Sequence, residues 1–193
     1  MTRRKSENMK LTMPVNESRD HIQGPASAPV TLLEYGDYEC PYCAQAYIII
    51  KEVQERLGSK LRFVFRNFPV TKVRPHAYET ALAAEAAAAQ GKFWEMYDYL
   101  FKHGQWVTND NLRQSAAKLG LGLARFDRDF LDRRYSSHID KDNKVPRAVG
   151  SKVLLLSLLM KIVIMVHGIW IASLVHLTKK VYSVGDRQTN SSI

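Results

Sequence analysis

The two cysteines of this chain are separated by two residues, in the segment Glu39-Cys40-Pro41-Tyr42-Cys43. Because the 193-residue chain contains no other cysteine, we expect the two thiols to act together. The chemistry that fits this spacing is thiol–disulfide exchange, since a helix N-terminus stabilises the thiolate of a cysteine placed there. Pro41 suits the first helical position, because its fixed φ matches a helix and its missing N–H costs nothing there.

The flanking sequence predicts a strand, a short loop and a helix that position these thiols. Residues Val30–Tyr35 are a β-branched and apolar run, and Ala44–Leu57 carries apolar residues at helical spacing.

A strand before the cysteine pair favours a redox site over a zinc site. Zinc remains the alternative, but a structural site needs further ligands, which the six scattered histidines would have to supply. A purely structural disulfide would close too short a loop to stabilise the fold much. We therefore expect neither a metal ion nor a cofactor.

The composition of the chain indicates which kinds of binding partner to expect. The net charge is +9, and much of it lies in short clusters at Arg3–Lys5, Arg133–Arg134 and Lys179–Lys180. Since these clusters form no stripe interleaved with aromatic residues, we expect no nucleic-acid binding. The first residues contain no apolar stretch typical of a secretory signal, so we expect a cytoplasmic protein. We also expect a monomer.

The chain divides into four regions by composition. Residues 1–20 are polar and predict a flexible tail, and residues 21–73 predict a βαβ unit whose second strand is Leu61–Asn67. Residues 74–140 predict an inserted helical subdomain, with the residues that follow forming an aberrant C-terminal segment, 141–193. The expected helices are His76–Gln90, Phe93–Phe101, a helix with possible caps among Thr108–Asn111 and running to Lys118, and Leu123–Tyr135.

Several separated motifs carry a family resemblance. They are Gly24-Pro25, Glu34–Cys43, Arg66–Pro69, Pro75–Ala77 and Gln90–Met96. Together, over about residues 21–140, they resemble the DsbA-like family of thioredoxin-fold disulfide oxidoreductases. The resemblance implies an α/β thioredoxin-like fold with an inserted helical subdomain, and disulfide exchange with protein thiols and a redox partner protein. The same domain also occurs fused to membrane antiporters, so the resemblance fixes no substrate.

On this interpretation each residue of the site has an expected role. Cys40, exposed at the helix start, is the attacking thiolate, and Cys43, one turn further in, is the resolving thiol. Pro41 and Tyr42 tune the electrostatics at the helix end. Glu34 is a candidate proton acceptor for Cys43, and the alternative is an ordinary surface carboxylate at a strand edge.

The C-terminal part departs from the family. A loop with the sequence Gly-Val-x-Gly-Thr-Pro-Thr, whose cis-proline faces the cysteines, is missing, and the apolar run Lys152–Val166 stands in its place. Synonymous codons can be chosen for Lys152–Met160 so that triplets read from the third base of each codon encode Gly-Thr-Pro-Thr-Phe-Phe-Ile-Asn. We hypothesise a single-base frameshift near Asn143–Val149, after which the family's C-terminal strands are missing or replaced.

Three alternative interpretations remain open. Taken at face value, residues 153–177 are apolar for long enough to span a bilayer, which would anchor the chain in a membrane. A non-catalytic remnant or binding module of the same fold is the second alternative. A glutaredoxin-like reductase is the third, although the long helical block fits that smaller fold poorly.

Overall fold

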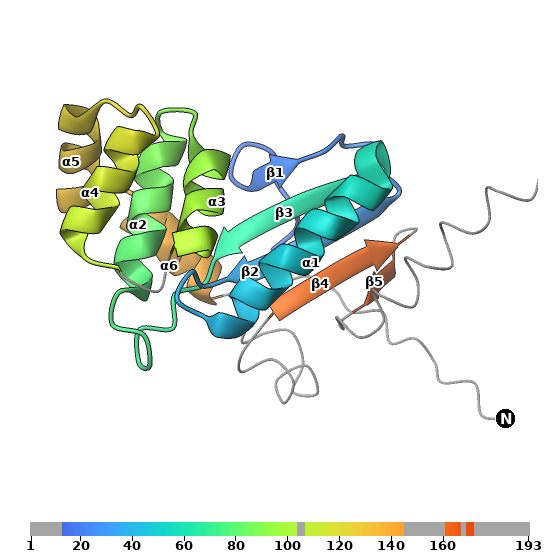
Figure 1. Cartoon of the computed structure of the whole chain (residues 1–193). Helices are drawn as coiled ribbons and strands as arrows, with labels where there is room; N and C mark the ends of the chain where they lie inside the picture. The colour runs from blue at the N-terminus through green and yellow to red at the C-terminus, as the bar shows by residue number, and fades with distance from the viewer. Residues whose placement is uncertain (1–12, 104–106, 145–160, 167–168, 172–193) are drawn as a thin grey trace, which may run out of the picture.

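The computed structural model describes residues 13–103, 107–144, 161–166 and 169–171. Its centre is a five-stranded sheet in the order β1-β3-β2-β4-β5 (Figure 1). The strands are β1 (His21–Gln23), β2 (Val30–Gly36), β3 (Leu61–Asn67), β4 (Lys161–Val166) and β5 (Ile169–Ile171). The helices are α1 (Pro41–Leu57), α2 (Ala77–Ala88), α3 (Phe93–His103), α4 (Asn109–Lys118), α5 (Leu123–Leu131) and α6 (Ser136–Lys144), and a short 3-10 turn, η1 (Gly58–Lys60), follows α1.

Strands β2 and β3 are parallel and α1 connects them, which confirms the predicted βαβ unit. Their register pairs Val30 with Leu61 at one end and Gly36 with Asn67 at the other. Both strands therefore end at the same edge of the sheet, and the loops that follow them emerge there together. The predicted α/β thioredoxin-like fold with helices inserted after this unit is confirmed.

The two faces of the sheet are covered differently, because side chains alternate along each strand. Leu32, Phe63 and Phe65 belong to the main core, which also contains the buried sides of α1, α2 and α3. The opposite face carries a smaller cluster of Leu33, Tyr35 and Val64, with Val15, Ile22 and Phe68 packed against it.

The helical block lies at one end of the sheet (Figure 1). The expected helices are present as α2, α3, α4 and α5, and the hydroxyl of Thr108 caps α4 by accepting a hydrogen bond of 3.2 Å from the Asn111 N–H. Helix α6, which extends beyond the expected boundary at residue 140, was not predicted. Its sequence has no apolar stripe, yet it contacts β3 and α2 through residues such as the buried Ile139.

Part of the segment that the sequence predicts to be a flexible tail packs against the sheet. Residue Asp20 is buried, and its carboxylate accepts two hydrogen bonds of 2.9 Å from the Arg66 guanidinium, whose side chain is also buried. Arg66 donates further to the Tyr35 hydroxyl and to the Met13 and Pro14 carbonyls. Of the expected flexible segment 1–20, the described residues 13–20 are thus held against the sheet by a partner distant in sequence.

Two strands lie in the segment that departs from the family pattern. Strand β4 pairs with β2, and β5 with β4, both antiparallel. The apolar, β-branched sequence Lys161–Val166 favours a strand whatever its origin. Within residues 153–177 the described backbone is therefore strand and not one long helix.

Among the described ranges, no helix is both long enough and apolar enough to cross a membrane. The position of the missing proline loop lies outside the described residues.

Candidate active site

The cysteine pair occupies the start of α1, as its sequence predicts. Cys40 is the N-cap residue, with φ −82° and ψ 118°, and Pro41 is in the first helical turn. The Cys40 carbonyl accepts a 3.0 Å hydrogen bond from the Ala44 N–H, which closes the first turn. Both cysteines are thiols in this structure. The backbone N–H groups of Tyr42 and Cys43 at this helix end donate to the Cys40 sulfur, where they favour its thiolate form.

The cysteines are more enclosed than we expected. Cys40 is 1% exposed and Cys43 is 2% exposed, so the expectation that Cys40 is exposed is wrong. Pro41 and Tyr42 are the exposed members of the motif, with Tyr42 at 45%. The reason is local packing, because Cys40 and Cys43 both belong to the main hydrophobic core.

A cavity of about 730 Å³ opens beside Cys40. Its walls are the start of α1, the end of α3 and the face of α4, and they include Tyr38, Pro41, Phe101, Leu112 and Lys118. The inserted helices therefore form one side of the space next to the first sulfur.

The two sulfurs differ in acidity because they interact. A hydrogen bond from the Cys43 thiol lowers the pKa of Cys40 from 9.0 to about 6; burial opposes this shift, while backbone N–H groups and the charge of Arg74 add to it. The same hydrogen bond and burial raise the pKa of Cys43, and the Glu34 carboxylate raises it further. At neutral pH the Cys40 sulfur is therefore mostly ionised, whereas Cys43 keeps its proton.

Asp37, which sequence analysis did not single out, connects the loop that follows β2 with the loop that follows β3. Its carboxylate accepts hydrogen bonds from the Glu39 N–H at 2.9 Å and the Val70 N–H at 2.8 Å, and it pairs with Arg74 at 3.3 Å. The Cys40 N–H donates to the Asp37 carbonyl at 3.0 Å. An Asp side chain that accepts a hydrogen bond from the backbone N–H two residues later forms an Asx turn. An Asp at the start of the loop after the predicted strand was therefore the sequence signal that could have identified Asp37.

Glu34 is fully buried, which excludes the surface carboxylate that we considered. Desolvation raises its pKa to about 8, although a hydrogen bond from Tyr97 opposes the shift; the charge of Cys40 raises it further. The Glu34 carboxylate raises the pKa of Cys43, and the charge of Cys40 raises the pKa of Glu34, which supports the expected proximity of Glu34 to the cysteine pair.

Glu39 connects the cysteine loop to the helical block. Its carboxylate accepts a 3.0 Å hydrogen bond from the N–H of His76, the residue that caps α2. Burial raises the pKa of Glu39.

These features define a thioredoxin-like dithiol protein, in which a Cys-x-x-Cys segment opens the helix between two parallel strands. The family described as thioredoxin matches residues 16–153, most of the chain. The chain belongs to this thioredoxin family, and its fold is that of the DsbA-like proteins.

Curated relatives and solved structures agree on the domain. The chain is 46% identical over 132 residues to a Na(+)/H(+) antiporter NhaA 3 of Salinispora tropica, covering 68% of this chain and 20% of that protein. It is 38% identical over 134 residues to an antiporter NhaA of Herminiimonas arsenicoxydans, covering 69% of this chain and 21% of the relative. The chain thus spans about a fifth of the length of these relatives.

Two solved structures show the same fold. α-DsbA1 of Wolbachia pipientis has a TM-score of 0.70 at 16% identity, covering 91% of this chain and 94% of that one. BdbD of Bacillus subtilis has a TM-score of 0.68 at 20% identity, covering 93% and 99%.

Proposed function

We propose that this domain is a thiol–disulfide oxidoreductase that exchanges disulfides with protein substrates through Cys40 and Cys43. The observation that carries the proposal is the opposite shift of the two pKa values at the start of α1. One sulfur is a thiolate near neutral pH and the other holds a proton, which is the asymmetry that sequential exchange requires.

The proposed reaction has two steps. The Cys40 thiolate attacks one sulfur of a substrate disulfide, so that a mixed disulfide forms and the other substrate sulfur leaves as a thiolate. Cys43 then loses its proton and attacks the Cys40 sulfur, which forms the Cys40–Cys43 bond and releases the second substrate thiolate. Two electrons pass from the dithiol to the substrate, and the reverse sequence oxidises a substrate dithiol.

Glu34 fits the role of proton acceptor for Cys43 in the second step. A carboxyl with a pKa of about 8 is partly ionised near neutral pH, and this ionised fraction can take up the Cys43 proton in a buried position where water is scarce. The cavity beside Cys40 is the approach that we propose for the substrate segment carrying the disulfide.

We expect turnover to be weak for this chain, because no proline follows Pro146 and the family's cis-proline loop is therefore missing. The hypothesis of a frameshift explains this loss. Sequencing the gene across the codons for Asn143–Met160 tests it: a second frame encoding Gly-Thr-Pro-Thr is expected, and its absence would refute the frameshift.

Trapping of the mixed disulfide tests the proposed activity. Incubated with a model protein disulfide, Cys43→Ser should accumulate a covalent adduct that dithiothreitol releases, and Cys40→Ser should form none. Gln45→Ser, an exposed replacement on the same helix, is the matched control and should behave as the parent chain. A chain whose Cys43→Ser variant forms no adduct is a non-catalytic remnant.

A further inference from the structure

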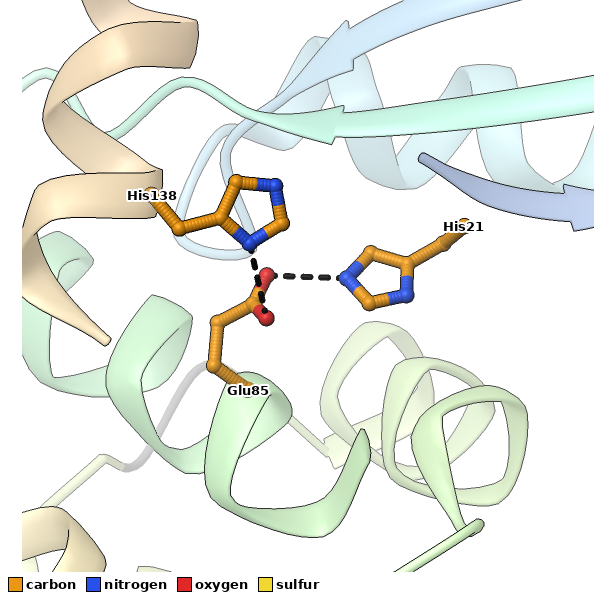
Figure 2. Close-up of side chains that lie close together, drawn as sticks. All are labelled: His21, Glu85 and His138. Carbon is orange, nitrogen blue, oxygen red and sulfur yellow. Dashed lines mark hydrogen bonds and ion pairs between the residues drawn. The ribbon is translucent and has the colours of Figure 1, made fainter. Parts of the chain in front are cut away.

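Three side chains from distant parts of the sequence lie close together (Figure 2). They are His21 on β1, Glu85 on α2 and His138 on α6. The His21 Nε2 lies 2.8 Å from the Glu85 Oε1, and the His138 Nδ1 lies 3.2 Å from the Oε2 of the same carboxylate. The ligand-type atoms of all three residues lie within 4.8 Å of one another.

We propose that His21, Glu85 and His138 bind one divalent transition-metal ion of the zinc class. Two imidazole nitrogens and one carboxylate oxygen are a donor set that suits Zn²⁺ with one further position left for water or an external ligand. Magnesium and calcium prefer sites made of oxygen atoms alone, so the two imidazoles argue against them.

Groups behind the three ligands hold them in place, as the outer ligand shells of metal sites do. The Asn67 amide donates a 2.7 Å hydrogen bond to the Glu85 Oε1, and the His21 ring stacks on Phe93 with the ring centroids 3.4 Å apart. The buried His138 Nε2 has no hydrogen-bond partner within the described residues, and the Asp142 carboxylate faces it at 3.7 Å. A metal on Nδ1 would leave the ring proton on Nε2, directed at this carboxylate.

The position of the cluster also fits an ion that enters from solution. Glu85 is 4% exposed, whereas the side chains of His21 and His138 are 15% and 22% exposed, so the histidines form the outer side. The Arg19 guanidinium donates a 2.5 Å hydrogen bond to Asp142, which directs its charge toward that carboxylate.

A bound ion would connect the first strand to two helices of the inserted block. His21 and Glu85 are 64 residues apart, and Glu85 and His138 are 53 apart. Since the three ligands come together only in the folded chain, zinc should raise the thermal unfolding midpoint in a concentration-dependent way.

Zinc binding by a cysteine-free chain tests the proposal independently of the redox site. All variants carry Cys40→Ser and Cys43→Ser, so that thiolates contribute no ligand, and no histidine tag is present. Equilibrium dialysis against Zn²⁺ should give one ion per chain. His21→Ala, His138→Ala and Glu85→Gln should each remove this stoichiometric binding, and Asp142→Asn should weaken it about 10- to 100-fold.

The exposed histidines supply the matched controls. His76→Ala and His103→Ala remove the same type of side chain from surface positions outside the cluster and should retain one ion per chain. Loss of binding in these controls to the same extent, or no saturable binding by the parent, would overturn the proposal.

A spectroscopic measurement keeps the test decisive if a ligand variant fails to fold. Co²⁺ added to the folded cysteine-free chain should give visible d–d bands of nitrogen and oxygen ligation, which one equivalent of Zn²⁺ abolishes and a large excess of Mg²⁺ does not. The absence of such bands, or their equal loss with Mg²⁺, would contradict a zinc-class site.

Discussion

The Tyr97 hydroxyl donates a long hydrogen bond of 3.4 Å to the Oε2 of Glu34 inside the core. The other carboxyl oxygen of Glu34 has no hydrogen-bond partner among the described residues, and no part of the side chain reaches solvent. One weak donor does not compensate the desolvation of a negative charge, and so the carboxyl is mostly, but not entirely, protonated at neutral pH.

Glu34 should make the stability of the domain depend on pH. Its pKa is about 8 in the folded chain against 4.5 unfolded, so its contribution is fully present below pH 4.5 and is lost as the pH rises through 8. In this window the free energy of unfolding should fall by about 1.4 kcal/mol per pH unit through this group. Urea unfolding at several pH values should show this slope in the parent and a smaller one in Glu34→Gln.

Tyr97→Phe is the matched variant for this measurement, because it removes the hydrogen bond and keeps the ring. Since that bond lowers the pKa of Glu34, its loss should extend the decline of stability to higher pH. An unchanged slope in Glu34→Gln would show that other groups account for the pH dependence.

The charge of Arg74 should lower the pKa of the Cys40 thiol. Thiolate absorbance in the ultraviolet, followed against pH, should give a transition near pH 6 that is absent from Cys40→Ser. Arg74→Ala removes one of the causes of the lowered pKa and should shift the transition upward. Lys72→Ala, an exposed cation in the same loop, should leave it in place; equal shifts in both variants would indicate a general charge effect.

The buried pair of Asp20 and Arg66 should contribute far more to stability than the surface pair of Glu17 and Arg62. Asp20→Ala leaves a buried guanidinium without its carboxylate and should cost about 3–5 kcal/mol. Glu17→Ala breaks a 2.9 Å contact in which the glutamate is 70% exposed, and it should cost about 1 kcal/mol or less. Chemical denaturation compares the two, and similar losses would contradict the assigned role of Asp20.

Gly36 is required where β2 ends against the core. A Cβ at this position would lie 2.3 Å from the Cε2 of the Phe65 ring. Gly36→Ala should therefore destabilise the domain by about 1–3 kcal/mol. The double variant with Phe65→Leu should lose less than the sum of the two single losses, because the smaller side chain relieves the clash. Additive losses would mean that the ring is not the obstacle.

Sequence pattern predicted the elements whose signals are local. Strands β2 and β3 have short apolar runs, α2 is rich in alanine, and α4 has its Thr108 cap. The cysteine spacing and Pro41 likewise predicted the helix start at the site. Each of these signals lies within a few residues of the structure that it specifies.

Features that depend on distant partners were not predictable in this way. The three-residue strand β1 exists because it pairs with β3, and α6 has a polar sequence whose few buried residues meet other elements. The ordering of Asp20 depends on Arg66, 46 residues further along. For the same reason the sequence of the cysteine motif did not indicate that surrounding elements bury Cys40.

Strands β2 and β3 end at the same edge of the sheet, and the loops that follow them lie next to each other there. Gly36 lies opposite Asn67, so the cysteine loop and the loop that carries Arg74 leave the sheet side by side and are joined by Asp37. Substitutions in the second loop can therefore change the charge near the sulfur while the sheet and the helix that supports it stay the same. In this architecture, the pKa of the Cys40 thiol can be altered by substitutions in a neighbouring loop that is separate from the helix carrying the cysteines.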